Sequence, residues 1–128
     1  MTDIKVIKTT DAPAAIGPYS QGILVGPFLF VSGQLPIDPI SGQLVVGEVK
    51  DQVHQSLKNL KTIIESAGGT LENAVKTTVF LKDMNDFAQV NEVYGQYFKD
   101  HYPTRSAVEV ACLPKDAKVE IEAIFYIG

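Results

Sequence analysis

The segment PTRSAVEVACLPKDAKVEIEAIFYIG (residues 103–128) contains two β-type runs, 106–111 and 119–127, which are joined by the turn-rich link LPKDAK. Successive side chains of a strand point to opposite faces, so alternation assigns each residue to a face. In the first run Val108 and Val110 share the apolar face, and the second run has an equally regular apolar face. We expect the two runs to pair as a hairpin with their apolar sides together.

In that hairpin Glu109, Glu120 and Glu122 gather on the opposite side, where clustered carboxylates need solvent, protons or a cation. Arg105 is the only arginine of the chain. It lies on the same face of the strand as Ala107 and Glu109 by alternation, so it can reach the surface that carries the glutamates. A lone guanidinium on a firm sheet suits a small carboxylate, because its fork donates two parallel hydrogen bonds. The alternative is a solvated face with one surface ion pair.

Composition limits the classes of function. A chain of 128 residues with 45% hydrophobic content predicts one domain, residues 1–128, with a real core. The net charge of -4 and the scattered lysines disfavour binding to nucleic acid or to an anionic membrane. No apolar run approaches the roughly 20 residues that span a bilayer. The first residues also lack the apolar core of a secretory signal, so we expect a cytoplasmic protein.

The cysteine and the histidines argue against metal and disulfide chemistry. Cys112 is the single cysteine, which excludes an internal disulfide and fits a reducing compartment. Its parity places it with Val108 and Val110, so we expect a buried structural thiol. His54 and His101 stand far apart, and no CxxC or HExxH motif occurs, which makes a metal site improbable.

The remaining elements predict an α+β fold. The apolar stripe of each predicted helix occupies a single side, so both helices should cover the same face of one mixed β-sheet, as a two-layer sandwich. By alternation, the uncovered face carries Phe80, Ile124 and Tyr126 besides glutamates, and such a face suggests a partner surface, most simply another copy of the chain. The further strands are expected at 3–7, 22–25, 28–32 and 74–81, and the helices at 48–67 and from 83 or 85 to 98.

Four residues at three places in the chain could add polar groups to a binding site. Tyr19 lies in the rigid segment APAAIGPYSQG, Ser32 and Gly33 end a strand, and Asn91 lies beside the apolar stripe of the second helix. Each also has an ordinary structural explanation: a packed loop aromatic, common turn chemistry and a solvated helix residue.

The strings APAAIGPYSQG, SGQLP, KTTVFLKDMNDFAQVNEVY and PTRSAVEVACLPKDAKVEIEAI resemble the RidA (YjgF) family of enamine and imine deaminases, in the right order and over nearly the whole chain. The resemblance implies a chorismate-mutase-like fold and a homotrimer in which the sheets line a central barrel. It further implies clefts between neighbouring subunits that bind a small 2-imino or 2-oxo acid.

The resemblance also implies roles for particular residues. Arg105 would hold the substrate carboxylate, and Glu120 would orient a water molecule and move protons during its attack on the imine carbon. Backbone groups around Gly33 and Ala107 would help to place the substrate, and no cofactor is required. Tyr19, Ser32 and Asn91 match further positions of the family's pocket, and Glu122 could tune Glu120.

One departure from the family pattern concerns a thiol. The family commonly has cysteine two residues after the arginine, where this chain has Ala107, which argues against a thiolate nucleophile or a redox switch there. Three rival functions remain open: a regulatory trimer that binds small carboxylates without turnover, a ribonuclease or translation inhibitor, and a chaperone-like or structural trimer.

Overall fold

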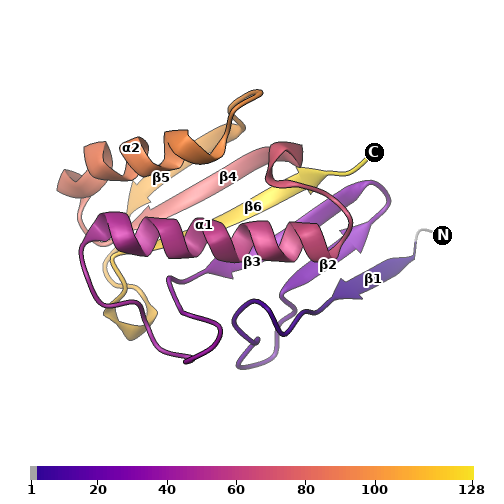
Figure 1. Ribbon diagram of the computed structural model, residues 1–128, viewed down its shortest axis with the longest axis horizontal. Coiled ribbons are helices and arrows are strands. Elements are labelled where there is room, and N and C mark those ends of the chain that lie inside the picture. The colour runs from indigo at the N-terminus through magenta and orange to yellow at the C-terminus, as the bar shows by residue number, and fades with distance from the viewer. Residues whose placement is uncertain (1–2) are drawn as a thin grey trace.

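The computed structural model describes residues 3–128, which form one six-stranded sheet with two helices on one of its faces (Figure 1). The strands are β1 (Ile4–Ile7), β2 (Gly22–Val25), β3 (Phe28–Gln34), β4 (Ala74–Leu81), β5 (Thr104–Glu109) and β6 (Val119–Tyr126). The helices are α1 (Val49–Ser66) and α2 (Phe87–Tyr97). Single 3-10 turns lie at Leu71–Asn73, Met84–Asp86 and Pro114–Asp116.

The sheet is mixed, in the order β1-β2-β3-β6-β4-β5. All neighbouring strands are antiparallel except β4 and β5, which run parallel and are connected through α2. The expected α+β fold, with two helices on one face of a mixed sheet, is therefore confirmed. No helix within residues 3–128 is long and apolar enough to cross a membrane.

The predicted hairpin of the two C-terminal runs is wrong. β5 pairs only with β4, and β4 lies between β5 and β6. The link LPKDAK therefore passes across the end of β4, and Lys82 N donates to Lys118 O there. Because α2 returns the chain so that β5 pairs with β4 in the parallel sense, β5 and β6 are consecutive in the sequence but separated in the sheet by β4.

This pairing reverses the face assigned to β5. Val79 of β4 is buried and lies opposite Ala107, whereas Val108 pairs with Phe80 on the other face and is 41% exposed. The apolar side of the first run is thus outside the core. Cys112 is exposed, so the expectation of a buried thiol is also wrong.

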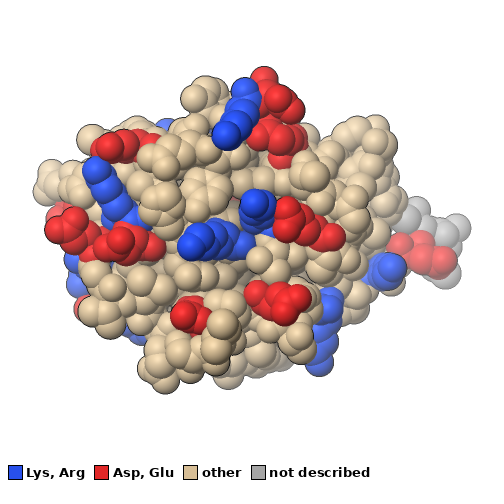
Figure 2. Space-filling view, viewed as in Figure 1, with Lys and Arg blue, Asp and Glu red and all other residues tan. Residues whose placement is uncertain are grey.

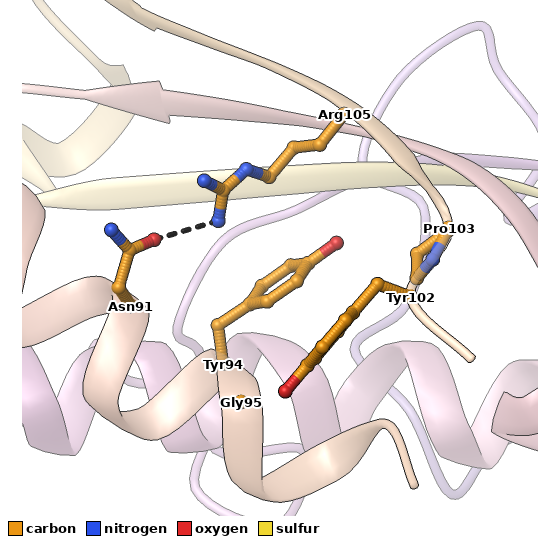
Figure 3. A pocket seen from close by; sticks show the side chains of 6 residues that line it. All are labelled: Asn91, Tyr94, Gly95, Tyr102, Pro103 and Arg105. Atoms are coloured by element: carbon orange, nitrogen blue, oxygen red, sulfur yellow. Dashed lines mark hydrogen bonds between the residues drawn. The ribbon is translucent and has the colours of Figure 1, made fainter. Parts of the chain in front are cut away.

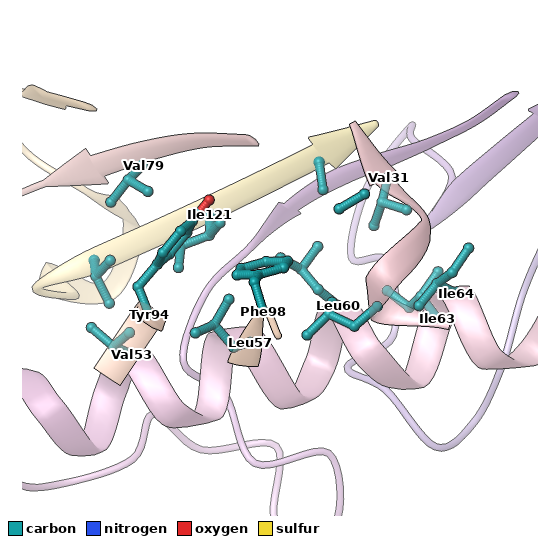
Figure 4. Close-up of a cluster of buried hydrophobic side chains, with 14 of the residues drawn as sticks. Val31, Val53, Leu57, Leu60, Ile63, Ile64, Val79, Tyr94, Phe98 and Ile121 are labelled. Atoms are coloured by element: carbon teal, nitrogen blue, oxygen red, sulfur yellow. The ribbon is translucent and has the colours of Figure 1, made fainter. Parts of the chain in front are cut away.

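Both helices have sequence-encoded ends and buried stripes. Glu48 and Asp51 form a reciprocal capping box at the start of α1, and Gly68 follows its end with φ 94°, a left-handed conformation that glycine adopts without strain. Asp83 accepts a hydrogen bond from the backbone N–H of Asn85 in the turn before α2. Figure 4 shows the buried stripes against the sheet, with Val53, Leu57, Leu60, Ile63 and Ile64 on α1 and Tyr94 on α2. Val90 of α2 is also fully buried.

The opposite face of the sheet is uncovered by this chain. It exposes large apolar side chains, namely Ile4, Val6, Phe28, Phe30, Val108 and Tyr126. Glu120 and Glu122 share that face, as alternation predicted. Glu109 does not, because it pairs with buried Leu81 on the helix side, where its carboxylate accepts the Met84 N–H at 2.8 Å.

Charges on the helix-bearing face are mixed in sign. Figure 2 shows lysine and arginine side chains interspersed with aspartate and glutamate, without a continuous basic patch on the described part of this face. A duplex or strand of nucleic acid would need such a patch.

Candidate active site

Arg105 lies on the helix side of β5, beside Thr77 of β4. Its guanidinium carbon is 4.9 Å from the centroid of the Tyr94 ring and 5.2 Å from that of Phe87, and both rings come from α2. Its Nη1 donates a 2.7 Å hydrogen bond to Oδ1 of Asn91, one turn before Tyr94 (Figure 3). The structure thus brings Asn91, one of the predicted pocket residues, next to the guanidinium.

The guanidinium borders an open hollow of about 430 Å³. The two ion pairs within residues 3–128 join Lys50 to Glu92 and Lys82 to Asp116, so no described carboxylate pairs with Arg105. A guanidinium has five N–H donors, and a carboxylate ligand can take two of them in parallel. The hollow is lined by Asn91, Tyr94, Gly95, Tyr102, Pro103 and Arg105.

Ala107 follows Arg105 on the same side of β5, half-buried and packed against the core. Ala107 does not line the hollow, so the predicted contact of its backbone with a substrate stays a prediction. Cys112 does not line the hollow either.

Glu120 borders a second hollow of about 520 Å³, together with Tyr19, Ser32 and Gly33. β3 carries an irregularity here, because three residue steps from Val31 to Gln34 oppose two on β6. Such a bulge places an extra residue at the strand and re-aims its neighbours. A Cβ added to Gly33 would lie 2.9 Å from Cδ of Glu120, so glycine is required for the carboxyl group to lie against the β3 backbone.

Side-chain hydrogen bonds hold the loop that carries Tyr19. The Ser32 hydroxyl donates a 2.6 Å hydrogen bond to the Ser20 carbonyl. Gln21, only 3% exposed, donates from Nε2 to the carbonyls of Thr9 and Pro13 and accepts the Thr9 N–H. Sequence reasoning missed this role of Gln21; its only signal was an amide residue next to a predicted strand in a segment rich in proline and glycine.

The Glu120 carboxyl group is half-buried, and burial raises its pKa above the ordinary value of 4.5; the negative charge of Glu122 raises it further. Within residues 3–128 no side-chain hydrogen bond or ion pair holds this carboxyl. A carboxyl group whose pKa is moved toward neutrality can exchange protons with a bound substrate.

The two hollows do not form one site in a single protomer. Arg105 aligns across β4 with Ala123 of β6, and Glu120 lies three residues before Ala123 on the opposite face. At ordinary strand dimensions their Cα atoms are about 14 Å apart, with side chains that diverge. The prediction that Arg105 reaches the same surface as Glu120 is wrong within one chain.

The predicted site residues therefore fall into two half-sites. Arg105 and Asn91 form the guanidinium half-site, with Ala107 nearby. Tyr19, Ser32, Gly33 and Glu120 form the carboxyl half-site. Leu35, Pro114 and Lys115 also line the carboxyl half-site and were missed, since nothing in their local pattern marked them.

The described residues include no cluster of three or more His, Cys, Asp or Glu side chains that could hold a metal ion. The two histidines are separately engaged. His54 Nδ1 lies 2.9 Å from the Tyr97 hydroxyl, and His101 Nε2 donates to the Ala74 carbonyl at 2.9 Å.

Comparison with known proteins gives consistent matches. The family model described as Endoribonuclease L-PSP matches residues 9–127. A RutC family protein of Pyrococcus horikoshii is 57% identical over 122 residues, which cover 95% of this chain and 97% of that protein. The 2-iminobutanoate/2-iminopropanoate deaminase of Homo sapiens is 53% identical over 124 residues, covering 97% and 90%. The crystal structure of E. coli TdcF with bound serine has a TM-score of 0.92 at 50% identity, covering 97% and 99%.

Proposed function

Because the chain belongs to the Endoribonuclease L-PSP family, the RidA-type family that its motifs resemble, we propose that it is an imine deaminase. Its substrates are small 2-imino acids, 2-iminobutanoate and 2-iminopropanoate, which it hydrolyses to 2-oxo acids and ammonia. The single observation that carries this proposal is the pair of half-sites, an unpaired guanidinium and a carboxyl with a raised pKa, in a chain 53% identical to a deaminase of that name.

The guanidinium half-site supplies substrate binding. Arg105 donates two hydrogen bonds to the substrate carboxylate, while Asn91 keeps one further N–H occupied and fixes the fork. The carboxylate is the one group common to every 2-imino acid, so this contact positions the neighbouring C=N carbon whatever side chain the substrate carries.

The carboxyl half-site supplies proton transfer. Glu120 in its ionised form takes a proton from the attacking water, whose oxygen bonds to the imine carbon, and returns a proton to nitrogen. The C–N bond of the resulting carbinolamine then breaks, and ammonia leaves as the carbonyl forms. General acid and base help of this kind gives about 10²–10⁴-fold in rate, which suffices for an imine that already hydrolyses in water. Tyr19, Ser32 and the Gly33 backbone border this reaction space.

Two copies of the chain complete one site. We propose a homotrimer of single-domain subunits whose clefts join the guanidinium half-site of one copy to the carboxyl half-site of the next. Two features support this assembly: the half-sites lie on opposite faces of one sheet, and the uncovered face is rich in exposed apolar side chains. The single cysteine supports a place in the reducing cytoplasm.

A competition assay tests the activity. A threonine dehydratase generates the imine from threonine, semicarbazide traps it, and the protein must divert it to 2-oxobutanoate before trapping. We expect diversion by the wild type, none above background by Arg105→Ala, and full diversion by Lys58→Ala, which removes a positive charge from the exposed side of α1. Failure of the folded wild type to divert the imine would refute the proposal.

The same preparation separates the rival functions. A regulatory module would bind 2-oxobutanoate through Arg105 without any turnover. A ribonuclease would cleave RNA, yet the net charge of -4 and the separately engaged histidines give it neither a basic surface nor a pair of imidazoles for acid-base chemistry.

A further inference from the structure

The aromatic floor beneath Arg105 has no assigned role in the reaction described above. Tyr94 and Phe87 lie under the guanidinium at 4.9 Å and 5.2 Å from ring centroid to guanidinium carbon. Tyr94 is 4% exposed, and its hydroxyl shares a 2.7 Å hydrogen bond with the hydroxyl of Thr77, which is 1% exposed. Thr77 is the residue that lies directly beside Arg105 in the parallel ladder of β4 and β5.

These contacts link α2 and β4 to the Arg105 guanidinium. The Tyr94 ring rises from α2, its hydroxyl is tied to β4 next to the Arg105 backbone, and the guanidinium lies over the ring face (Figure 3). The hydrogen bond of the hydroxyl restrains the ring against rotation and against sliding along the sheet. Asn91, one turn earlier in the same helix, takes one N–H and sets the rotation of the fork.

We propose that Tyr94, anchored by Thr77 and assisted by Phe87, is a positioning residue that holds the Arg105 guanidinium in its carboxylate-binding orientation before the substrate arrives. An arginine side chain otherwise loses considerable rotamer freedom when it binds. A guanidinium stacked on an aromatic face keeps its N–H edges free for a carboxylate, and the cation–π attraction strengthens as water is excluded. The floor thus lowers the ordering cost of binding.

The Tyr94 hydroxyl keeps its proton in neutral solution. Burial raises the pKa of the Tyr94 hydroxyl, while the Thr77 hydrogen bond and the Arg105 charge act in the opposite direction with smaller effect. The hydroxyl therefore remains protonated in neutral solution, and the ring stays an uncharged neighbour for the guanidinium.

The prediction concerns binding of the carboxylate and not the chemical step. Tyr94→Leu removes the ring and should weaken binding of 2-oxobutanoate by about three- to tenfold and raise KM for the imine by a similar factor, with kcat kept. Tyr94→Phe keeps the ring but removes its hydrogen bond to Thr77, so it should recover only part of that loss. Phe87→Leu should give a smaller effect of the same kind, since Phe87 is not anchored by a hydroxyl.

Tyr97→Phe is the matched control. It deletes another partly buried hydroxyl of α2 that is bonded to His54, away from the guanidinium. It should lower the melting temperature as Tyr94→Phe does and leave KM, kcat and the Kd for 2-oxobutanoate unchanged. Thermal melts of every variant, followed by circular dichroism, separate loss of fold from loss of binding.

The test measures binding and turnover separately. The turnover measurement rests on the proposed function, whereas the binding measurement does not. Calorimetric titration with 2-oxobutanoate measures binding alone, and the competition assay measures turnover. Weaker binding by folded Tyr94→Leu, recovered in part by Tyr94→Phe, supports the inference even if the wild type lacks turnover, whereas full recovery by Tyr94→Phe would overturn the anchoring role of Thr77. A folded Tyr94→Leu variant that binds 2-oxobutanoate as the wild type does, or one that loses kcat with KM unchanged, would overturn it.

Discussion

Arg105 and Glu120 lie on opposite faces of the sheet, two strands apart, although both belong to the last quarter of the chain. The first faces α2, and the second faces the side that this chain leaves uncovered. One protomer therefore offers two complementary half-sites: a carboxylate receptor on one side and a proton-transfer group on the other. A complete site therefore requires the two halves to meet between copies of the chain.

Replacement of Glu120 by glutamine should separate activity from stability. Burial and the charge of Glu122 raise the folded-state pKa, so folding disfavours the ionised carboxyl; its contribution to stability is present below the ordinary glutamate range and is lost as pH rises through the raised pKa. Glu120→Gln stays neutral, so its melting temperature should exceed that of the wild type at about pH 8 and approach it in acid. Turnover should fall by about 10²-fold or more.

The pH dependence of wild-type kcat also tests the role of the Glu120 carboxyl. If ionised Glu120 activates water, kcat must rise with pH through a midpoint above 4.5, the ordinary value for glutamate. Glu122→Gln should move that midpoint downward, because it removes the neighbouring negative charge that raises the pKa. A midpoint unchanged by Glu122→Gln would contradict the coupling of the two carboxyls.

Gly33→Ala tests the close approach of the Glu120 carboxyl to β3. The added Cβ would lie 2.9 Å from Cδ of Glu120, so the carboxyl must move and kcat should fall on the order of 10- to 100-fold. Gly26→Ala, in the turn between β2 and β3, is a control for the substitution itself, since its Cβ would meet no atom within 4 Å. Because Gly26 has a φ of 57°, that change should cost about 1 kcal/mol of stability and leave kcat unchanged. Steady-state rates and melts distinguish the two.

Much of the fold was predictable because its signals are local. The bounds of β4 agree with the alternating run 74–81, and α1 begins and ends within one residue of the predicted bounds. Both helices carry a single apolar stripe, the pattern of a helix that packs one side against a sheet.

The neighbour of β5 could not be predicted from alternation. Alternation tells which residues of a strand share a face, but not which strand it joins or which of its faces meets the helices. The rule that apolar residues face the core failed at Val108, since the uncovered face is itself apolar and Arg105 occupies the helix side at the edge of the sheet. The grouping of Tyr19, Ser32 and Gly33 with Glu120 likewise depends on β3 lying beside β6, a long-range contact.

Glu72 should stabilise the loop that leads into β5. Its two carboxylate oxygens accept the backbone N–H groups of Lys99 and Asp100 at 3.0 and 3.1 Å, and these hydrogen bonds lower its pKa. The stabilisation by Glu72 is present above pH 4.5, the ordinary pKa of glutamate, and is lost as the pH falls through the lowered pKa of Glu72. Glu72→Gln should thus lower the melting temperature at neutral pH by about 2–5 °C, with a smaller difference in acid.

The control for that change is Glu65→Gln, which removes the same charge from an exposed position near the end of α1. It should leave the melting temperature within about 1 °C of the wild type. Equal melting curves for the two variants at neutral pH would show that the two backbone hydrogen bonds contribute nothing measurable.

Subunit complementation measures directly whether Arg105 of one copy and Glu120 of another form one active site. Arg105→Ala and Glu120→Ala should each be inactive alone, because every site lacks one half. After the two are unfolded together in equal amounts and refolded, random assembly places an intact guanidinium half-site against an intact carboxyl half-site in about a quarter of all clefts, so about a quarter of wild-type activity should return. The double variant refolded with either single variant must stay inactive. Absence of any recovered activity in the mixed, refolded assembly would contradict a site shared between copies.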